Sequence, residues 1–340
     1  METLTKTKKL TGSKAMTLAI EQEMERDDKI FIMGEDVGTY GGIFGSSTGL
    51  KEKFGSDRVM DTPISETAFI GAAIGAAAEG FRPIVELMFV DFHGVVMDQI
   101  YNHMAKITYM SGGNVKLPIV LTTAVGGGYS DAAQHSQTLY ASFGHLPGLK
   151  VVAPTYPFDI KGLMAAAIRD DNPVVFMFHK TLQGLGWMDQ IPASFGPVPE
   201  EEYTLPLNKA KVVQEGSDIT IVGVQMMTVA AVKAAEILDG SAISAEIIDL
   251  ISVKPIDKET IINSVKKTGR LLIVDEDYMS YGITAEVAAI VASEGFAALK
   301  APICRLANPD VPIPYSRVLE QYVLPNSHKI AEAAKKVIYS

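Results

Sequence analysis

Cysteine is nearly absent from the sequence, because Cys304 is the only one among 340 residues. A single cysteine excludes an intrachain disulfide and a metal site built from several cysteines. Positive charge is also in deficit: 40 acidic residues outnumber 30 lysines and arginines, which gives a formal net charge of -10. Such a chain has no general electrostatic attraction for nucleic acid or for an anionic membrane surface. We therefore expect neither as a partner.

Long hydrophobic runs are lacking as well. The longest run of small and apolar residues, Ala68 to Ala78, is shorter than the about 20 residues that span a bilayer. The first ten residues, Met1 to Leu10, are polar and contain lysines, without the apolar core of a secretory signal. Together with the single cysteine, these absences favour a cytoplasmic protein.

Several catalytic signatures are missing too. The sequence has no HExxH motif and no GxSxG motif, so neither zinc hydrolysis nor a serine nucleophile is indicated. Neither GxxxxGK[ST] nor GxGxxG occurs as part of a strand-turn-helix unit, which argues against a phosphate loop or a dinucleotide fold. Four of the six histidines are not spaced as metal ligands usually are, namely His103, His145, His179 and His328.

What the sequence does contain is an alternation of strand-length apolar runs with amphipathic helical segments. This alternation is typical of parallel sheets with helical crossovers, so the predicted class is α/β. Ser13 to Arg26 is a predicted helix with Ser13 as its N-cap and apolar residues at helical spacing. The strands predicted in this half are Lys29 to Gly34, Pro83 to Phe89, Leu117 to Thr123, Lys150 to Ala153 and Pro173 to Phe178.

The pattern breaks at Asp189 to Pro206, a stretch rich in proline and acids, and then restarts. We predict two doubly wound domains, residues 1–190 and 207–340, with a linker at 191–206. The predicted strands of the second domain are Asp218 to Val224, Ala245 to Asp249, Arg270 to Asp275 and Pro302 to Leu306, and its helices are Thr228 to Leu238, Lys258 to Lys267 and Ile283 to Ser293.

The first candidate for chemistry is Glu66, at the end of the segment DTPISE. Ser65 is a candidate N-cap, which puts Glu66 in the first turn of a helix, where the helix dipole favours a carboxylate. Such a glutamate is commonly just a solvated surface residue. The apolar residues that follow it predict an apolar wall that would raise its pKa. Gly71 and Gly75, one turn apart, would let another backbone approach closely, or simply pack within the chain.

Two further segments follow predicted strands. ELMFVDF, Glu86 to Phe92, ends a strand at the edge where parallel sheets usually bind ligands, although Phe89 and Phe92 could equally be core residues. GGGYSDAAQHSQ, residues 126–137, is a glycine-rich loop that leads to His135. A histidine in such a loop can carry protons near neutral pH, or it can be an ordinary surface residue.

Seven ordered segments together make the chain resemble a known family. They are DTPISE, ELMFVDF, YMSGG at 109–113, AAQHSQ at 132–137, PGLKVVAP at 147–154, DEDYMSYGITAEVAA at 275–289 and VPIPYSRVLEQYVLP at 311–325. The resemblance covers nearly the whole chain. It is to the beta subunit of the first component of 2-oxo-acid dehydrogenase complexes, which includes the pyruvate, branched-chain and acetoin dehydrogenases.

The resemblance implies a pyrimidine-binding domain followed by a transketolase-like C-terminal domain. It implies that Glu66 hydrogen-bonds the aminopyrimidine of thiamine diphosphate and helps to activate this cofactor. Phe92 matches the aromatic residue that packs on the pyrimidine ring, and Phe89 is a weaker candidate for the same surface. His135 matches a histidine that assists proton or acyl transfer to a lipoyl group.

The family resemblance also implies partners and ions. Because the sequence has no GDG motif for magnesium and diphosphate, an alpha subunit would have to supply that half of the site. The family pattern is an alpha-two beta-two heterotetramer that docks on a dihydrolipoyl acyltransferase core. A structural potassium ion is possible near the residues that match Ile119, Ala167, Asp170 and Asn172.

Two departures from the family pattern concern the substrate. Val95 stands where pyruvate-type relatives often have a polar residue, and Phe178 with His179 occupies a stretch that is commonly acidic. ELMFVDF and VPIPYSRVLE favour the acetoin-cleaving branch slightly over the pyruvate and branched-chain branches. Two other classes remain alternatives, a nicotinamide-dependent dehydrogenase and a scaffolding paralogue without catalysis. The missing glycine fingerprint argues against the first, and the presence of Glu66, Phe92 and His135 argues against the second.

Overall fold

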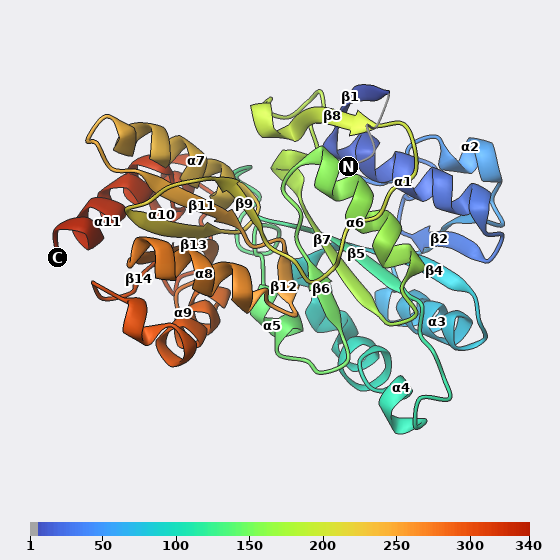
Figure 1. Cartoon of the computed structure of the whole chain (residues 1–340). Helices are drawn as coiled ribbons and strands as arrows, with labels where there is room; N and C mark the ends of the chain where they lie inside the picture. The colour runs from blue at the N-terminus through green and yellow to red at the C-terminus, as the bar shows by residue number, and fades with distance from the viewer. Residues whose placement is uncertain (1–5) are drawn as a thin grey trace. The chain divides into compact units, whose positions relative to one another are not determined.

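The computed structural model describes residues 6–340, which form two compact units. Of the described residues, the first unit comprises 6–125 and 143–207, and the second comprises Gly126–Ser142 and Asn208–Ser340. Each unit has a mainly parallel sheet with helices on both faces (Figure 1), so the predicted α/β class is confirmed. The stretch at 126–142 groups with the second unit, although the predicted first domain included it. No helix within residues 6–340 is long and apolar enough to cross a membrane.

The sheet of the first unit consists of parallel strands that are almost continuously apolar. Such runs form buried strands because both faces of the sheet are covered by helices. The five strands predicted here exist, with bounds shifted by up to three residues, and the short β3 was missed. The order across the sheet is β6 (Lys150–Val152), β7 (Val174–His179), β5 (Val120–Val125), β4 (Arg82–Phe89), β2 (Ile30–Gly34) and β3 (Val59–Asp61).

Three long helices cover this sheet. Figure 1 shows α1 (Gly12–Arg26) and α6 (Pro157–Arg169) side by side over one face and α3 (Glu66–Ala78) over the other. The predicted N-cap of α1 was wrong by two residues: Thr11 precedes the helix, and its hydroxyl accepts a hydrogen bond from the Lys14 amide at 3.2 Å. Threonine can cap a helix as serine does, so both residues were compatible with the pattern.

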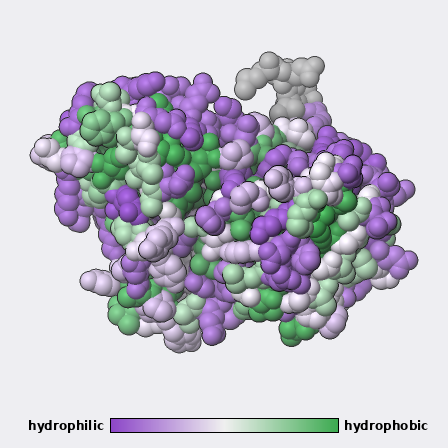
Figure 2. All heavy atoms as spheres, turned by 90° about the horizontal axis from the view of Figure 1, so that it is seen from below, coloured by the Kyte–Doolittle hydropathy of each residue, from purple (hydrophilic) through white to green (hydrophobic). Residues whose placement is uncertain are grey.

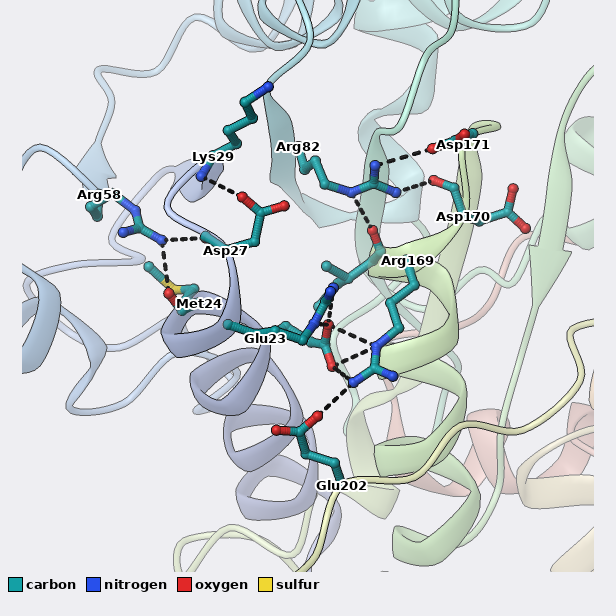
Figure 3. A network of polar contacts seen from close by, with 12 residues as sticks. Glu23, Met24, Asp27, Lys29, Arg58, Arg82, Arg169, Asp170, Asp171 and Glu202 are labelled. Atoms are coloured by element: carbon teal, nitrogen blue, oxygen red, sulfur yellow. Dashed lines mark hydrogen bonds and ion pairs between the residues drawn. The ribbon is translucent and has the colours of Figure 1, made fainter.

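A buried ion pair joins α1 to α6. Glu23 is 1% exposed, and Arg169 donates to its carboxylate from Nε at 3.0 Å and from one terminal nitrogen at 2.6 Å. Arg26 donates to the same carboxylate at 2.8 Å, and Arg169 also reaches Glu202 (Figure 3). The buried charge of Glu23 is thereby compensated by two guanidinium groups.

The segment predicted as a linker contains a strand. β8 (Phe195–Pro199) pairs with β1 (Thr7–Thr11) in an antiparallel two-stranded sheet. Pro197 and Pro199 lie within β8, which is possible because proline is tolerated on an edge strand. The sequence did not predict this strand because prolines are uncommon in strands. The remaining short elements of the first unit are α2 (Leu50–Phe54), η1 (Val90–Val96), η2 (Gln99–Met104), α4 (Ile107–Met110), η3 (Lys180–Leu182) and η4 (Pro192–Ser194), while α5 (Tyr140–Gly144) bridges the boundary.

The sheet of the second unit runs in the order β14 (Cys304–Asn308), β13 (Leu271–Tyr278), β10 (Ile219–Gly223), β11 (Ala245–Asp249) and β9 (Lys211–Gln214), with β9 antiparallel. Helices α7 (Met226–Asp239) and α11 (Ser327–Tyr339) cover one face, and α8 (Lys258–Thr268) and α9 (Ile283–Glu294) cover the other. The four strands and three helices predicted here exist. β9, β12 (Ser252–Lys254), η5 (Phe296–Ala298), α10 (Arg317–Val323) and α11 were not predicted.

Candidate active site

Glu66 lies at the carboxyl edge of the first sheet. β3 ends at Asp61, the chain turns, and α3 begins with Glu66, so the predicted first-turn position is correct. Ser65 occupies the N-cap position, but its hydroxyl donates to the Pro63 carbonyl at 3.1 Å instead of capping the helix. Glu66 is half-buried.

Of the five apolar residues that predicted an apolar wall around Glu66, three are buried, but Ala68 and Ala72 are exposed on α3. Another carboxyl group, Glu35, interacts with Glu66. Glu35 follows the end of β2, the strand next to β3, and is 9% exposed. Burial and the negative charge of Glu66 raise the pKa of Glu35 above its ordinary value. The site therefore contains two interacting carboxyl groups, of which the sequence had indicated one.

The expected close approach of another backbone at the α3 glycines is not found in the described chain. Only the Gln99 side chain lies near the position that a Cβ at Gly71 would take, at 3.8 Å. The corresponding position at Gly75 faces open space within residues 6–340. Within residues 6–340, close packing therefore does not require glycine at either position.

The aromatic candidates lie at the end of the neighbouring strand β4. Phe89 is its last residue and Phe92 is in η1, and their ring centroids are 5.7 Å apart in an edge-to-face arrangement. Behind them the buried Phe44 packs on Phe89 at 5.6 Å. Both Phe89 and Phe92 are half-buried. Edge-to-face packing fixes the orientation of such rings.

One hydrogen bond ties the carboxylate-bearing helix to the aromatic segment. Thr67, next to Glu66 on α3, donates from its hydroxyl to the Val95 carbonyl in η1 at 2.8 Å. The structure therefore brings Glu66, Phe89 and Phe92 to one edge of the first unit. Lys180, buried at the end of β7, is near the same edge, with its ammonium 5.8 Å from the centroid of Phe89. The sequence analysis did not single out Lys180.

A glycine-rich loop that the sequence analysis passed over lies beside this edge. Asp61 accepts hydrogen bonds from the Gly38 amide at 2.6 Å, the Thr39 hydroxyl at 2.6 Å and Lys51 at 2.8 Å. Although burial opposes it, these bonds hold the pKa of Asp61 well below its ordinary value. Asp61 thus connects the segment after Glu35 to the segment before Glu66. The signal was visible, because Asp61 opens the motif DTPISE.

Glu86 is a further carboxyl group that the sequence analysis treated only as part of a strand. It is 4% exposed on β4, and the Ser46 hydroxyl donates to it at 2.6 Å. Burial raises its pKa to about 7, although the Ser46 bond lowers it. A glutamate inside an otherwise apolar run of a parallel strand is the signal that could have identified it.

His135 lies in the second unit, whereas Glu66, Phe89 and Phe92 lie in the first. Its side chain is half-buried in the loop between β5 and α5. Of the other histidines near the motifs, His93 packs on Phe143 with ring centroids 5.7 Å apart, and burial lowers its pKa. His179 is fully buried and pairs with the Thr181 hydroxyl at 2.7 Å.

The residues suggested for potassium gather where α6 ends and β7 begins. The Ile119 carbonyl accepts from Val174 at 3.0 Å, the Ala167 carbonyl accepts from the Asp170 amide at 3.3 Å, and Asn172 donates to the Asp170 carboxylate at 2.9 Å. The Asp170 carbonyl accepts from the Arg82 guanidinium at 2.8 Å (Figure 3). The arrangement fits a cation only in part, because Arg82 already brings a positive charge there. Among residues 6–340 no cluster of three His, Cys, Asp or Glu side chains is arranged to hold a metal.

Comparisons with known proteins identify the domains of this chain. The family model described as "Transketolase, pyrimidine binding domain" matches residues 8–184, and "Transketolase, C-terminal domain" matches residues 208–330. A solved structure of a "Split gene transketolase, inactive beta4 tetramer" superposes with a TM-score of 0.78 at 22% identity, covering 97% of this chain and 99% of that one. Residues 8–184 therefore form a transketolase-type pyrimidine-binding domain, which includes the stretch 126–142, and residues 208–330 form a transketolase-type C-terminal domain.

Curated relatives define the family more narrowly. The chain is 45% identical to the acetoin:2,6-dichlorophenolindophenol oxidoreductase subunit beta of Cupriavidus necator, with 97% of this chain and 98% of that protein covered. It is 44% identical to the 2-oxoisovalerate dehydrogenase subunit beta of Bacillus subtilis (95% and 97% covered) and 46% identical to the pyruvate dehydrogenase E1 component subunit beta of Rickettsia bellii (97% and 99% covered). The chain belongs to this family of first-component (E1) beta subunits, a thiamine-diphosphate-dependent family of oxidoreductases.

Proposed function

We propose that this chain is the beta subunit of a dehydrogenase that uses thiamine diphosphate to decarboxylate a 2-oxo acid or to cleave acetoin. The acyl or aldehyde-derived unit would then pass to a lipoyl group. The observation that carries the proposal is the grouping of Glu66, Glu35 and the Phe89 and Phe92 rings at one carboxyl edge of the first sheet. Ligands of open parallel sheets bind at such an edge.

Each residue at this edge has a role that suits its chemistry. The Glu66 carboxyl group would hydrogen-bond a ring nitrogen of the pyrimidine, and Phe92, supported by Phe89, would offer the ring a flat apolar surface. Glu35, whose pKa is raised, can hold a proton beside Glu66. His135 would move a proton during transfer to the lipoyl group. The bound cofactor would supply the stabilisation of a carbanion.

We also propose that the site is shared with an alpha subunit. The sequence contains no GDG motif, so the alpha subunit would hold magnesium and the diphosphate. An alpha-two beta-two heterotetramer and a dihydrolipoyl acyltransferase core would be the assembly partners, in the cytoplasm. Potassium near Ile119, Ala167, Asp170 and Asn172 stays a proposal of the same kind.

The comparisons do not distinguish which substrate this chain acts on. Relatives that act on acetoin, 2-oxoisovalerate and pyruvate by their names are 45%, 44% and 46% identical, so identity does not separate the branches. We favour acetoin slightly, on the segments ELMFVDF and VPIPYSRVLE. Phe178 and His179, where this chain departs from the family pattern, are fully buried, and Phe178 packs on Phe44 at 6.0 Å. Any effect of these two residues on substrate choice would therefore be indirect.

The test is co-expression with a candidate alpha subunit, followed by cofactor-dependent reduction of an artificial electron acceptor with acetoin, pyruvate and branched-chain 2-oxo acids in parallel. We expect turnover with one substrate class. Glu66→Ala should lower it at least about 100-fold, a loss in the range of general acid-base catalysis. Glu79→Ala, an exposed change at the other end of α3, should leave it unchanged.

Two outcomes would contradict the proposal. Full turnover in an assembled Glu66→Ala complex would remove Glu66 from the mechanism. A well-assembled, cofactor-loaded complex that converts none of the substrates would favour the scaffolding paralogue instead. The cation site is tested by measuring the thermal midpoint of the assembled complex in potassium and in choline. A bound structural potassium ion should make this midpoint higher in potassium than in choline.

A further inference from the structure

The loop Gly126–Ser142, which carries His135, has a strained backbone. Three of its non-glycine residues have positive φ angles: Ser130 at 59°, Ala132 at 61° and Leu139 at 50°. Side chains other than glycine rarely adopt this conformation, and it persists only where surrounding contacts enforce it. The contacts that hold this loop should therefore decide where His135 lies.

Two backbone amides of this loop donate to Glu320 on α10, which is separated from the loop by about 190 residues of sequence. One oxygen of its carboxylate accepts from the Gly128 amide at 2.8 Å. The other accepts from the Ser130 amide at 3.0 Å and lies 3.5 Å from the Ser130 hydroxyl. An ionised carboxylate only accepts hydrogen bonds, and bonds from amides to a charged oxygen are among the stronger ones.

The burial of Glu320 sets it apart from the rest of α10. Glu320 has no exposed surface, whereas Val318, Leu319 and Tyr322 on the same helix are exposed by 54% to 77%. A buried carboxylate is costly unless it is hydrogen-bonded, so an inward-facing position on this helix would ordinarily suit an apolar residue. The hydrogen bonds from the loop amides offset the cost of burying this carboxylate.

Other contacts hold the loop on both sides of His135. Before it, the Gly127 amide donates to Glu276 at 3.3 Å, and a side chain at Gly127 would meet Leu324 at 3.2 Å. After it, Tyr278 donates to the Gln137 side chain at 3.4 Å, and Tyr140 donates to Gln225 at 2.5 Å. The loop is thus attached to the second unit at each end. Glu320 is the contact that acts on the strained residue Ser130.

We infer that Glu320 is a positioning residue for His135: it fixes the strained loop through Gly128 and Ser130 and thereby sets the place of the histidine. The inference rests on the proposed role of His135 in transfer to the lipoyl group. Glu320 acts through the loop and is not a catalytic residue. Glu320 lies in the C-terminal domain, within the segment VPIPYSRVLEQYVLP, which the sequence analysis used only for the family resemblance and the choice of substrate branch.

The first experiment measures the loop directly and needs no activity. Amide hydrogen exchange of peptides from residues 126–142 is compared in the full chain, in Glu320→Ala and in Gln321→Ala, an exposed change on the same helix. We expect exchange at Gly128 and Ser130 to become at least about tenfold faster in Glu320→Ala, because their acceptor is lost. Exchange in Gln321→Ala should match the original chain. Unchanged exchange in Glu320→Ala would overturn the inference even if the enzyme proves to be of another kind.

The second experiment connects the loop to the reaction in the assembled complex. Glu320→Ala should slow acyl transfer to a lipoyl domain at least about tenfold, while reduction of an artificial acceptor changes by less than about twofold. Glu320→Gln retains one acceptor oxygen, so its rate of acyl transfer should lie between the rates of Glu320→Ala and of the original chain. In a His135→Ala background, Glu320→Ala should add little further loss, because both changes affect the same step.

The double variant separates positioning from general structural damage. If Glu320→Ala lowers transfer by the same factor with and without His135, it acts independently of the histidine and the inference fails. An equal loss of transfer and of artificial-acceptor reduction would also overturn it. A wild-type complex without activity would sink the proposed function alone, since the exchange measurement still decides whether Glu320 fixes the loop.

Discussion

At position 86 a carboxyl group sits in the middle of a parallel strand that is covered on both faces. Glu86 is 4% exposed and accepts one hydrogen bond from Ser46. Water can no longer stabilise its charge, which is why burial raises its pKa to about 7. The unfolded chain would lose this proton near the ordinary value of 4.5. The folded chain therefore retains the proton across a pH range in which the unfolded chain releases it.

Glu86 should make folding pH-dependent with a definite sign. Since the folded state binds the proton more tightly, the stability that Glu86 contributes is complete below pH 4.5 and is lost as the pH rises to about 7. A change of this size corresponds to at most about 3 kcal/mol. Glu86→Gln, which stays neutral and can still accept from Ser46, should therefore be more stable than the original chain at pH 8 and similar to it at pH 5.

Urea unfolding at several pH values checks this prediction. The informative quantity is the difference in unfolding free energy between Glu86→Gln and the original chain at each pH. The exposed change Glu52→Gln serves as the control and should show no such trend. A difference for Glu86→Gln that stays constant from pH 5 to pH 8 would mean that position 86 keeps an ordinary ionisation in the folded chain.

At the scale of helices, the contact between α1 and α6 combines apolar packing with the buried charge of Glu23. Arg169→Leu would leave Glu23 with Arg26 as a partner, so we expect a loss of about 1–3 kcal/mol of unfolding free energy. The double variant Glu23→Leu/Arg169→Leu should recover part of that loss, because no uncompensated carboxylate stays buried. Both changes are measured by denaturant unfolding.

A matched control exists on the other unit. Lys258 on α8 and Glu294 on α9 form an ion pair at 2.6 Å in which each side chain is about half-exposed, at 53% and 49%. Lys258→Ala should lower the unfolding free energy much less than Arg169→Leu does, because solvent screens exposed ion pairs and they contribute little. Equal costs for Arg169→Leu and Lys258→Ala would show that burial of Glu23 does not matter.

The same scale shows how far the sequence predicts the structure. Apolar runs gave the central strands and helical periodicity gave α1, α7, α8 and α9, because in these elements the pattern and the final burial coincide. The pairing of β1 with β8 could not be predicted, since it joins residues nearly 190 positions apart and includes prolines. The loop that Asp61 holds was also missed. It has left-handed glycines at Gly41, Gly42, Gly45 and Gly49, and its form depends on distant partners.

Some residues of the candidate site could be predicted from the sequence and others could not. Glu66, Phe89 and Phe92 lie in contiguous motifs and could be found from order and spacing. Glu35 could not, because its proximity to Glu66 follows from β2 and β3 being neighbours in the sheet. The contact of the His135 loop with Glu320 joins residues about 190 positions apart, so the sequence around His135 does not reveal it.

At the scale of the whole chain, hydrophobic side chains reach the surface in both units, and Figure 2 shows such residues on the face it presents. In the first unit Ile64, Tyr109 and Met110 are 65% to 88% exposed. In the second, α10 adds Val318 and Tyr322, each at least 75% exposed. Concentrated exposed apolar surface on a folded chain usually marks a contact with another protein. A chain that normally assembles with other subunits would have such surfaces.

We therefore expect the chain expressed alone to self-associate and co-expression with an alpha subunit to replace that self-association by a defined heterotetramer. Sedimentation velocity over a range of concentrations measures both states. Val318→Ser/Tyr322→Ser should reduce self-association if α10 takes part, and Ile64→Ser/Met110→Ser asks the same of the first unit, because a serine removes apolar surface without adding charge. Lys335→Ser, a polar change on the adjacent α11, is the control. A lone chain that stays monomeric at every concentration would mean that these side chains do not mark a subunit contact.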